Sequence, residues 1–457
     1  MRTRSRLISV VMVLGLVAAA CGRSGSEATP AGNDGSTAVA TACDGVSLEA
    51  TDTGVSADTI TIQVMADVGS SLAPGLFQSN IDAVKAYAER VNAEGGLACR
   101  KLVVETWDSK LSPDEAKNGQ IQACAASLAM VGGNTLFNPD VTEMDTCPDA
   151  QGQPTGVPDV AALANDVNEQ CSPNAYVIQA VPESCPIVPG QPRDLRAFVG
   201  QIPFYQTIEP DLRGLFLVPG DLPTTVQSAT YQIAGQAQAG VDWIGALKVS
   251  GRDEQSAYTP RVQTAKAGNA TYIYDGSNDA AMISMRREAA VQDLSGVSVW
   301  GCSVACYTQR YRDAAADVEG TYLWLQFLPF EEASTNAAAQ AYVDSVPSPD
   351  AGGAQAWQAA MLFRQVVDRI VASDGPNAVT RARVLQQLAA TDDFTADGWM
   401  GSEPKPLKGV SDCFVVVQMV GGEFVRRFPD EPGTLSCDPA NVATVRLDPA
   451  AAAADIR

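Results

Sequence analysis

The chain has 457 residues, 46% of them hydrophobic, so we expect two or three domains with substantial cores. The formal charge of −22 disfavours nucleic acid and anionic membrane surfaces as partners. The sequence contains no histidine, which excludes Ser-His-Asp and Cys-His catalysis and histidine-ligated zinc. It also lacks nucleophile elbows, phosphate-binding loops and dinucleotide-binding glycine motifs, so we expect no enzyme and no metal or cofactor.

Residues 1–21 have the layout of a bacterial export signal. Three arginines among the first six residues precede an apolar run over residues 7–16, and small residues then precede Cys21. This order resembles the lipobox of bacterial lipoproteins, although Ala18 stands where leucine is usual. A transmembrane anchor is the competing interpretation, but the run is shorter than the ~20 residues that span a bilayer. We expect lipidation at Cys21, attachment to the outer face of the cell membrane, and a flexible tether over residues 22–54.

Cysteine usage also indicates export. The chain has 11 cysteines, and removing Cys21 for lipidation leaves an even number, which suits an oxidising compartment. The sequence does not fix how they pair. We predict bonds between cysteines that are close in sequence. The irregular segment over residues 138–192 contains three further cysteines, and we expect disulfide bonding to hold this segment in place. The predicted pairs are Cys99–Cys124, Cys302–Cys306 and Cys413–Cys437.

Residues 60–135 predict a strand–helix–strand–helix–strand unit. The strand segments are apolar and β-branched, as is typical of buried parallel strands. The first helix ends at Gly95-Gly96, and Ser112 is a cap residue for the second. Ligands of such sheets bind beyond the carboxyl ends of the strands. The predicted strands are 60–66, 101–107 and 129–132.

At these residues the chain resembles the periplasmic solute-binding proteins of the leucine/isoleucine/valine-binding type, which are the receptors of branched-chain amino acid and amide ABC uptake systems. The most specific piece is Val-Asn-Ala-Glu-Gly-Gly at 91–96 with the strand after it, followed by Trp-Asp-Ser and Ser-Pro-Asp-Glu-Ala. A weaker likeness extends to about Pro432. The resemblance implies the type I periplasmic binding protein clamshell, in which two Rossmann-like α/β lobes with mostly parallel sheets are joined by a hinge.

A second α/β series follows in the chain. We predict a helix over residues 193–205, alternating strands and helices to 327, helices between 336 and 390, and a hairpin over 413–428. In the resembled family both lobes are discontinuous, and this implies a division of the chain. Lobe 1 would comprise residues 55–192 and 329–398, lobe 2 residues 193–328 and 399–440, and residues 441–457 would form a loosely held tail.

Residues in the loops after the strands are candidates for contact with a solute in the cleft between the lobes. Hydroxyls, amides and backbone N–H groups at those places could hold a carboxylate or an amide. Capping or turn roles are the alternatives for Ser, Thr and Asn, and core packing is the alternative for the aromatic. The candidates are Phe77, Asn134, Thr135, Ala164 and Asn165 in lobe 1, and Thr224, Thr225, Ser277, Asn278 and Ser303 in lobe 2.

The chain departs from the resembled family at the expected ligand position. Amino-acid binders of that family hold the ligand ammonium with an acidic side chain and an aromatic on lobe 2, where this chain offers Asn278 and Ser303. A neutral amide, an aromatic or aliphatic acid, or another small polar solute therefore fits as well as an α-amino acid.

The sequence thus predicts a monomeric, lipid-anchored extracytoplasmic receptor. It would close on a small polar solute and deliver it to ABC permease subunits in the membrane. Three alternatives stay open: a sensory ligand-binding lipoprotein without a permease, a secreted α/β enzyme that uses only Asp and Glu, and a structural or adhesive surface protein. A neighbouring permease operon and a turnover assay would separate the first two from the receptor.

Overall fold

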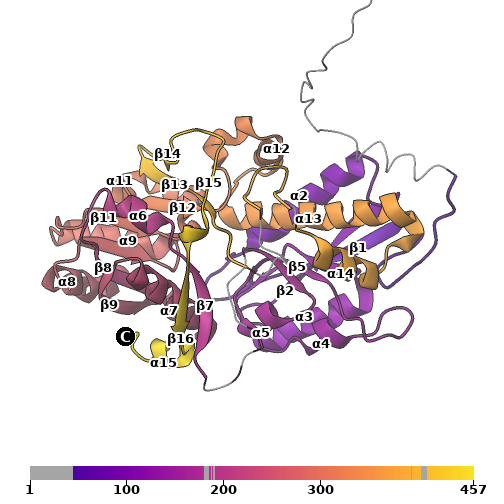
Figure 1. Ribbon diagram of the computed structural model, residues 1–457, viewed down its shortest axis with the longest axis horizontal. Helices are drawn as coiled ribbons and strands as arrows, with labels where there is room; N and C mark the ends of the chain where they lie inside the picture. The colour runs from indigo at the N-terminus through magenta and orange to yellow at the C-terminus, as the bar shows by residue number, and fades with distance from the viewer. Residues whose placement is uncertain (1–44, 180–184, 187, 189–190, 393, 403–408) are drawn as a thin grey trace, which may run out of the picture.

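The computed structural model describes residues 45–179, 185–186, 188, 191–392, 394–402 and 409–457 (Figure 1). The predicted export signal, the lipidation site at Cys21 and the tether before residue 45 lie outside these residues. Within the described part of the chain, helices fall short of the length and apolar character needed to cross a membrane. The described residues form two separate sheets covered by helices, and a small third sheet lies between them.

The first sheet has six strands, and all of its pairings are parallel. The strand order is β2-β1-β3-β5-β4, with β6 paired to β5. Its central strand β1 is buried on both faces, which explains its continuous apolar sequence. The strand bounds are β1 Thr59–Ala66, β2 Lys101–Asp108, β3 Ala129–Val131, β4 Asn134–Thr135, β5 Asp159–Ala164 and β6 Ala175–Gln179.

Helices cover both faces of the first sheet. Ile62 and Val64 of β1 belong to one apolar cluster with α2 and α13, whereas Met65 belongs to another with α3. Figure 1 shows α2 and α13 on one side of the strands and α3, α4 and α5 on the other. The bounds are α2 Gln78–Ala93, α3 Pro113–Ala126, α4 Thr142–Thr146, α5 Val167–Cys171, α12 Ala337–Ser345, α13 Ala351–Asp374 and α14 Arg381–Ala390.

The second sheet has eight strands in the order β14-β13-β12-β11-β10-β8-β9, with β15 paired to β13. Strands β8 to β12 are parallel, and β13 to β15 add antiparallel pairings. The strand bounds are β8 Arg213–Pro219, β9 Asp242–Val249, β10 Tyr272–Asp275, β11 Val299–Cys302, β12 Tyr322–Leu325, β13 Cys413–Val420, β14 Glu423–Phe428 and β15 Ser436–Cys437. The helices are α6 Gln201–Gln206, α7 Pro223–Gln238, α8 Thr259–Ala267, α9 Asp279–Val291, α10 Gln309–Asp313 and α11 Ala315–Val318.

The chain returns to each sheet after leaving it. Helix α13 packs on α2 and β5 of the first sheet, although it follows the parallel strands of the second sheet in sequence. Strand β13 then pairs with β12 of the second sheet. We call the first sheet with its helices lobe 1, and the second sheet with its helices lobe 2. The mixed α/β class with mostly parallel sheets is the class that the sequence predicts.

The helix predicted over residues 193–205 is wrong in its first half. Residues Arg193–Phe198 form strand β7, and a short helix, α6, follows. In β7 the buried Leu195 and Ala197 alternate with the exposed Asp194 and Arg196, which is the period of a strand rather than of a helix. Its partner strand lies about 250 residues further on, so the sequence near β7 does not reveal it.

That partner strand also overturns the prediction of a loose tail over residues 441–457. Strand β16 (Val442–Leu447) pairs antiparallel with β7 along its whole length. Helix α15 (Pro449–Ala453) follows it and packs on α7. Beyond the helix, Ile456 is buried and the Arg457 N–H donates to the Ala246 carbonyl. The segment therefore belongs to lobe 2, and its alanine-rich sequence hid the apolar contacts that hold it.

The tether prediction is likewise wrong for residues 45–54, which pack on lobe 1. The Asp52 side chain is buried and accepts hydrogen bonds from the N–H groups of Ala150 and Arg381. The Thr51 hydroxyl donates to the Val379 carbonyl. All these partners lie about 100 to 330 residues away in sequence. The segment itself is polar, and its own sequence does not reveal these distant partners, which is why it resembled a flexible tether.

Two of the three predicted disulfides are present, and the third is wrong. Cys302–Cys306 and Cys413–Cys437 form as predicted. Cys124 pairs with Cys147 instead of Cys99, because α3 and α4 pack together and bring the two residues within 6.1 Å between Cα atoms. Cys99 is disulfide-bonded elsewhere. A further bond, Cys171–Cys185, staples the excursion after β5, where the sequence predicts a staple.

A buried arginine fastens the start of α14 to the core of lobe 1. The Arg381 guanidinium donates hydrogen bonds to four backbone carbonyls, and its side chain is fully buried. These carbonyls would lose their partner in an Arg381→Met variant, at a cost of about 3 kcal/mol in the free energy of unfolding. Arg383→Met is the matched control on the same helix, because its solvent-screened pair with Asp374 should contribute much less to stability. Denaturant titration of both variants checks this, and equal losses would contradict it.

Candidate functional site

A buried carboxylate accepts hydrogen bonds from neighbouring loops at the carboxyl edge of the first sheet. Asp67 follows β1 directly and is fully buried. One carboxylate oxygen accepts from the Ser109 hydroxyl and the Leu111 N–H, each at 2.7 Å, and the other accepts from the Leu136 N–H at 2.8 Å. Burial raises the pKa of Asp67, while these hydrogen bonds act in the opposite direction. A single side chain thus joins the loops after β1, β2 and β4.

The predicted candidates of lobe 1 all lie at this edge. Asn134 and Thr135 form β4 and are buried, and the Thr135 hydroxyl lies 3.5 Å from that of Ser109. Ala164 ends β5 and is buried, and Asn165 follows it. Phe77 lies at the start of α2 and packs partly buried against the apolar core. The structure therefore brings the polar candidates together and gives Phe77 the packing role that was its alternative.

The candidates of lobe 2 divide into two groups. The side chains of Thr225, Ser277 and Asn278 bond within their own loops: the Thr225 hydroxyl donates to the Pro219 and Leu222 carbonyls, and Asn278 caps α9. The Ser277 hydroxyl accepts from the Asn278 amide, and Ser303 begins a short turn after β11. Thr224 differs, because its hydroxyl donates to the Leu136 carbonyl of lobe 1 at 2.7 Å.

Loops at the carboxyl ends of the two sheets meet directly. Besides the bond from Thr224, the Ser228 hydroxyl of α7 donates to the Asn165 side-chain oxygen at 2.9 Å. Thr224 and Ser228 are four residues apart, so they lie on one face of the helix. We call these two hydrogen bonds the interlobe contacts. They place the first turns of α7 against the loops after β4 and β5, so the carboxyl edge of each sheet faces the other.

A close backbone approach adds to the meeting of the two edges. A Cβ atom on Gly251, which follows β9, would lie 2.6 Å from the Leu72 carbonyl oxygen in the loop after β1. Any side chain at position 251 would force these loops apart. The two lobes also touch at the first residue of α13, where the Ala351 N–H donates to the Tyr307 carbonyl of lobe 2 at 3.3 Å.

Two amide atoms at this junction have no hydrogen-bond partner among the described residues. They are the side-chain oxygen of Asn134 and the side-chain nitrogen of Asn165, and both are inaccessible to solvent. An unpaired buried polar atom costs about 1–3 kcal/mol. One acceptor and one donor are therefore unpaired in the loops that make the interlobe contacts.

Lobe 2 has a buried carboxylate of its own at the end of β10. Asp275 is fully buried, accepts a hydrogen bond from the Ser277 N–H at 2.7 Å, and lies 4.0 Å from the sulfur of Cys302. Burial raises its pKa to about 8. Asp275, Cys302 and Cys306 are close enough together to bind a metal, but the two cysteines form a disulfide and so lack the thiolate that a metal requires.

Further buried acids lie in lobe 1. Asp159 begins β5, at the end of that strand opposite to the Asn165 loop, and Glu169 lies in α5. Burial raises the pKa of Asp159 to about 7, and burial together with the charge of Asp159 raises that of Glu169. Glu169 accepts a hydrogen bond from the Asn138 amide, which in turn accepts one from Gln120. Because Glu169 is already paired and Asp159 lies away from the junction, we do not place either acid in contact with solute.

Sequence reasoning missed Asp67, Asp275, Leu136 and Ser228. An acid directly after a buried strand was the available signal for Asp67 and Asp275, because such a side chain can accept N–H groups from neighbouring loops. Leu136 takes part through its carbonyl, which the residue type does not reveal. Ser228 lies within a helix, so its role depends on how the two lobes are placed.

Comparison with solved structures identifies the fold. No protein-family model matches the chain, and no curated protein matches it. A leucine-binding protein from Thermotoga maritima aligns over 83% of this chain and 99% of its own, with a TM-score of 0.60 and 14% identity. A fatty acid ABC transporter substrate-binding protein from Thermomonospora curvata aligns over 86% and 99%, with a TM-score of 0.59 and 18% identity.

A solute-binding protein of an ABC transporter from R. palustris, solved in complex with benzoate, is similar over 84% of this chain and 98% of its own. Its TM-score is 0.60 and its identity 15%. At such identities the likeness shows the fold alone. The chain has the type I periplasmic binding protein fold, which confirms the fold class predicted from the sequence.

Replacement of Asp275 should change how stability depends on pH. The native state keeps this proton up to about pH 8, whereas the unfolded chain loses it near the ordinary carboxyl pKa of 3.8. The native state therefore binds more protons between these values, so the carboxyl group lowers the free energy of unfolding as the pH rises. As the pH rises from 4 to 8, the free energy of unfolding of Asp275→Asn should increase relative to that of the wild type, by up to about 1 kcal/mol per pH unit.

Urea titrations of both proteins from pH 4 to pH 8 measure this difference. Asp344→Asn, a change to an exposed carboxylate on α12, is the matched control. A constant difference between Asp275→Asn and the wild type, or the same slope in the control, would contradict the assignment to Asp275.

Proposed function

We propose that the protein is an extracytoplasmic receptor that binds a small polar solute between its lobes and delivers it to the permease subunits of an ABC uptake system. The observation that carries the proposal is the meeting of the carboxyl edges of two parallel sheets, joined by the interlobe contacts at Thr224 and Ser228. Ligands of open α/β sheets bind at such edges. Solved structures with this fold are named as a leucine-binding protein, a fatty acid ABC transporter substrate-binding protein and a solute-binding protein in complex with benzoate, which agrees with a binding role.

Closure of the lobes is the proposed mechanism. A solute that touches both edges stabilises only the closed arrangement, so its binding shifts the population from open to closed. The interlobe contacts favour the closed state in the same way, and they raise the apparent affinity by increasing the fraction of molecules competent to bind. The hinge would lie in the connections between the predicted lobe segments, near residues 192, 329 and 399.

The chemistry of the junction favours a neutral or anionic solute. None of the ten candidate residues carries a charge. The Asp67 carboxylate already accepts three hydrogen bonds from protein donors, and the raised pKa of Asp275 keeps that group neutral at pH 7. A ligand ammonium would thus lack the free carboxylate that it needs. We infer an amide or a carboxylic acid that pairs with the free atoms of Asn134 and Asn165.

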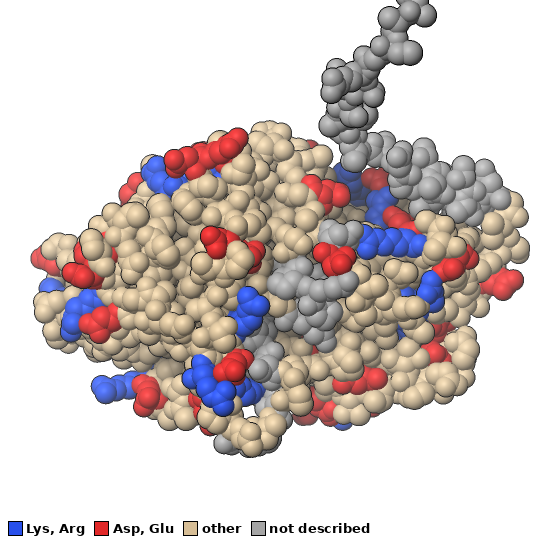
Figure 2. Space-filling view, viewed as in Figure 1, with Lys and Arg blue, Asp and Glu red and all other residues tan. Residues whose placement is uncertain are grey.

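The remaining parts of the proposal concern location and partners. Residues 1–21 would direct export and Cys21 would carry the lipid anchor, so the receptor would act as a monomer at the outer face of the membrane. Disulfides within both lobes agree with an oxidising compartment. Acidic and basic side chains are interspersed on the face shown in Figure 2, without the basic patch that nucleic acid would require. Solved structures with the same fold are named as binding proteins, which favours a receptor over an enzyme.

Thermal-shift screening of the protein against amides, aliphatic and aromatic carboxylates, and amino acids tests the function. Binding to the native state alone should raise the melting temperature with one chemical class, by several degrees at ligand concentrations near 100 times the dissociation constant. We expect amides or carboxylates to act and cationic amines to have no effect. A flat response to every class would contradict the proposal.

Neighbouring threonines supply the matched control for that screen. Thr224→Val removes an interlobe contact, whereas Thr225→Val removes a hydroxyl that bonds only within its own loop. We expect Thr224→Val to weaken binding of the active solute about fivefold, the equivalent of one hydrogen bond, and Thr225→Val to leave it unchanged. Equal effects of the two changes on affinity would place the binding site away from the junction.

A further inference from the structure

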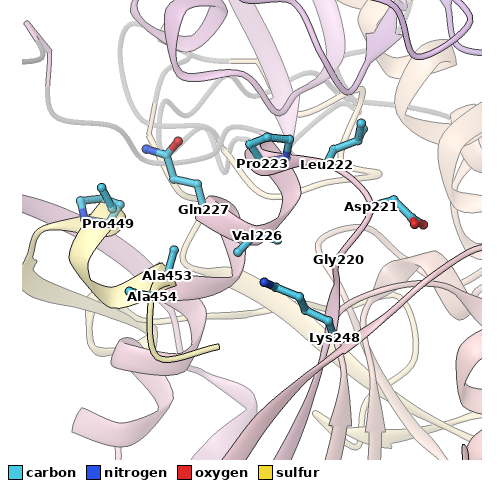
Figure 3. Close-up of a pocket in the computed structure, with 11 residues that line it drawn as sticks. Gly220, Asp221, Leu222, Pro223, Val226, Gln227, Lys248, Pro449, Ala453 and Ala454 are labelled. Atoms are coloured by element: carbon cyan, nitrogen blue, oxygen red, sulfur yellow. The ribbon is translucent and has the colours of Figure 1, made fainter. Parts of the chain in front are cut away.

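A surface cavity lies on lobe 2, on the side of α7 away from the interlobe contacts. Its volume is about 570 Å³, within the roughly 300–1,000 Å³ range of small-molecule pockets. The ends of strands β8 and β9, helix α7 and the C-terminal helix α15 line it, and it is open to solvent on one side (Figure 3). Because α15 belongs to the segment that the sequence predicts as a loose tail, sequence reasoning gave no sign of this cavity.

The walls of the cavity are mainly apolar. Val226 of α7 faces Pro449, Ala453 and Ala454 across it, and the amide of Gln227 lies at its rim near Pro449. Val226 is two residues from Thr224 and two from Ser228, so it occupies a different face of α7 from both of them. One helix therefore supplies both the interlobe contacts and a wall of this cavity.

A single cation points into the cavity. Figure 3 shows the ammonium of Lys248 directed toward Val226 and the alanines of α15. Its stem lies over Gly220, where an added Cβ would be 2.7 Å from Cβ of Lys248. Glycine at position 220 thus allows the lysine to lie across the cavity floor.

The Lys248 ammonium has no partner in the part of the chain that the structure describes, since neither a hydrogen bond nor an ion pair of its side chain is formed there. The nearest acid of the lining, Asp221, is turned away from the cavity. Its carboxylate accepts hydrogen bonds from the Ser250 hydroxyl at 2.6 Å and the Gly251 N–H at 2.7 Å. The cavity is open to solvent and therefore combines a mainly apolar lining with one exposed lysine whose ammonium has no acidic side chain as a partner among the described residues.

We propose that this cavity is a second binding site, for a small amphiphilic carboxylate. The apolar part of the ligand would pack against Val226, Pro449 and Ala453, and its carboxylate would form a charge-assisted hydrogen bond with Lys248. An uncharged molecule of the same shape would leave the lysine unpaired, and a cation would be repelled by it. The site does not depend on the proposed binding between the lobes.

Calorimetric titration of the full chain with octanoate tests the site, with 1-octanol as the uncharged probe of the same length. We expect octanoate to bind at least tenfold more tightly than 1-octanol. Lys248→Met, which keeps the stem and removes the charge, should weaken octanoate binding at least tenfold, and Lys248→Arg should retain most of it. Lys85→Met, at an exposed lysine of α2 in lobe 1, is the matched control and should have no effect.

A second variant fills the cavity without changing its charge. Ala453→Trp should abolish octanoate binding, and the unchanged circular dichroism of the variant would show that it folds. Octanoate affinity within twofold of the wild type in both Lys248→Met and Ala453→Trp would overturn the proposal. If Asn134→Ala weakened octanoate binding and Lys248→Met did not, the probe would bind between the lobes, which would refute this site and support the proposed function.

Discussion

The hydrogen bonds accepted by the buried Asp67 carboxylate are the interaction on which the rest of the site depends. They hold the loops after β1, β2 and β4 at one edge of the first sheet, and these loops would otherwise present unpaired N–H groups to each other. The Leu136 N–H donates to Asp67, and the carbonyl of the same residue accepts from Thr224 in lobe 2. A chain of bonds therefore runs from the core of lobe 1 to the first turn of α7.

Helix α7 links three features of the molecule. One face makes the interlobe contacts, its flank lines the cavity with Lys248, and its body packs on β7 and α15. The strands β7 and β16 form a separate pair that lies beside the main sheet of lobe 2 and supports this helix. The segment after residue 441 thus helps to fix the helix that meets lobe 1, although it lies far from the junction in sequence.

Local sequence patterns predicted the elements whose partners are near in the chain. The glycine end of α2, the Ser112 cap of α3 and the hairpin of β13 and β14 follow from rules that act over a few residues. Two of the errors concern distant partners: strand β7 pairs with a strand about 250 residues away, and Asp52 binds residues about 100 and 330 positions further on. The error at Cys124 concerns a partner 23 residues away, which the packing of α3 on α4 selects. Polar composition and spacing carry no information about such pairings.

The candidate site was predicted in outline because parallel strands end at a common edge, which places the residues after them close together. Asn134, Asn165 and Thr224 lie at the junction for that reason. Asn278 and Thr225 occupy loops of the same kind, yet their side chains bond their own backbone, as short polar side chains at helix starts commonly do. Which of these roles a residue takes depends on the position of the opposite lobe. A single sequence does not contain information about that position.

The distance between the lobes tests the central claim most directly. Genetically encoded spin labels at exposed positions 85 on α2 and 291 on α9 would avoid the native disulfides, and pulsed electron resonance would measure the distribution of distances between them. The account predicts that the active solute narrows this distribution toward the shorter distance, and that Thr224→Val with Ser228→Ala broadens it toward longer distances without solute. The same distance in the wild type without solute, the wild type with solute and the double variant would show that the lobes form a fixed unit. That result would contradict the account.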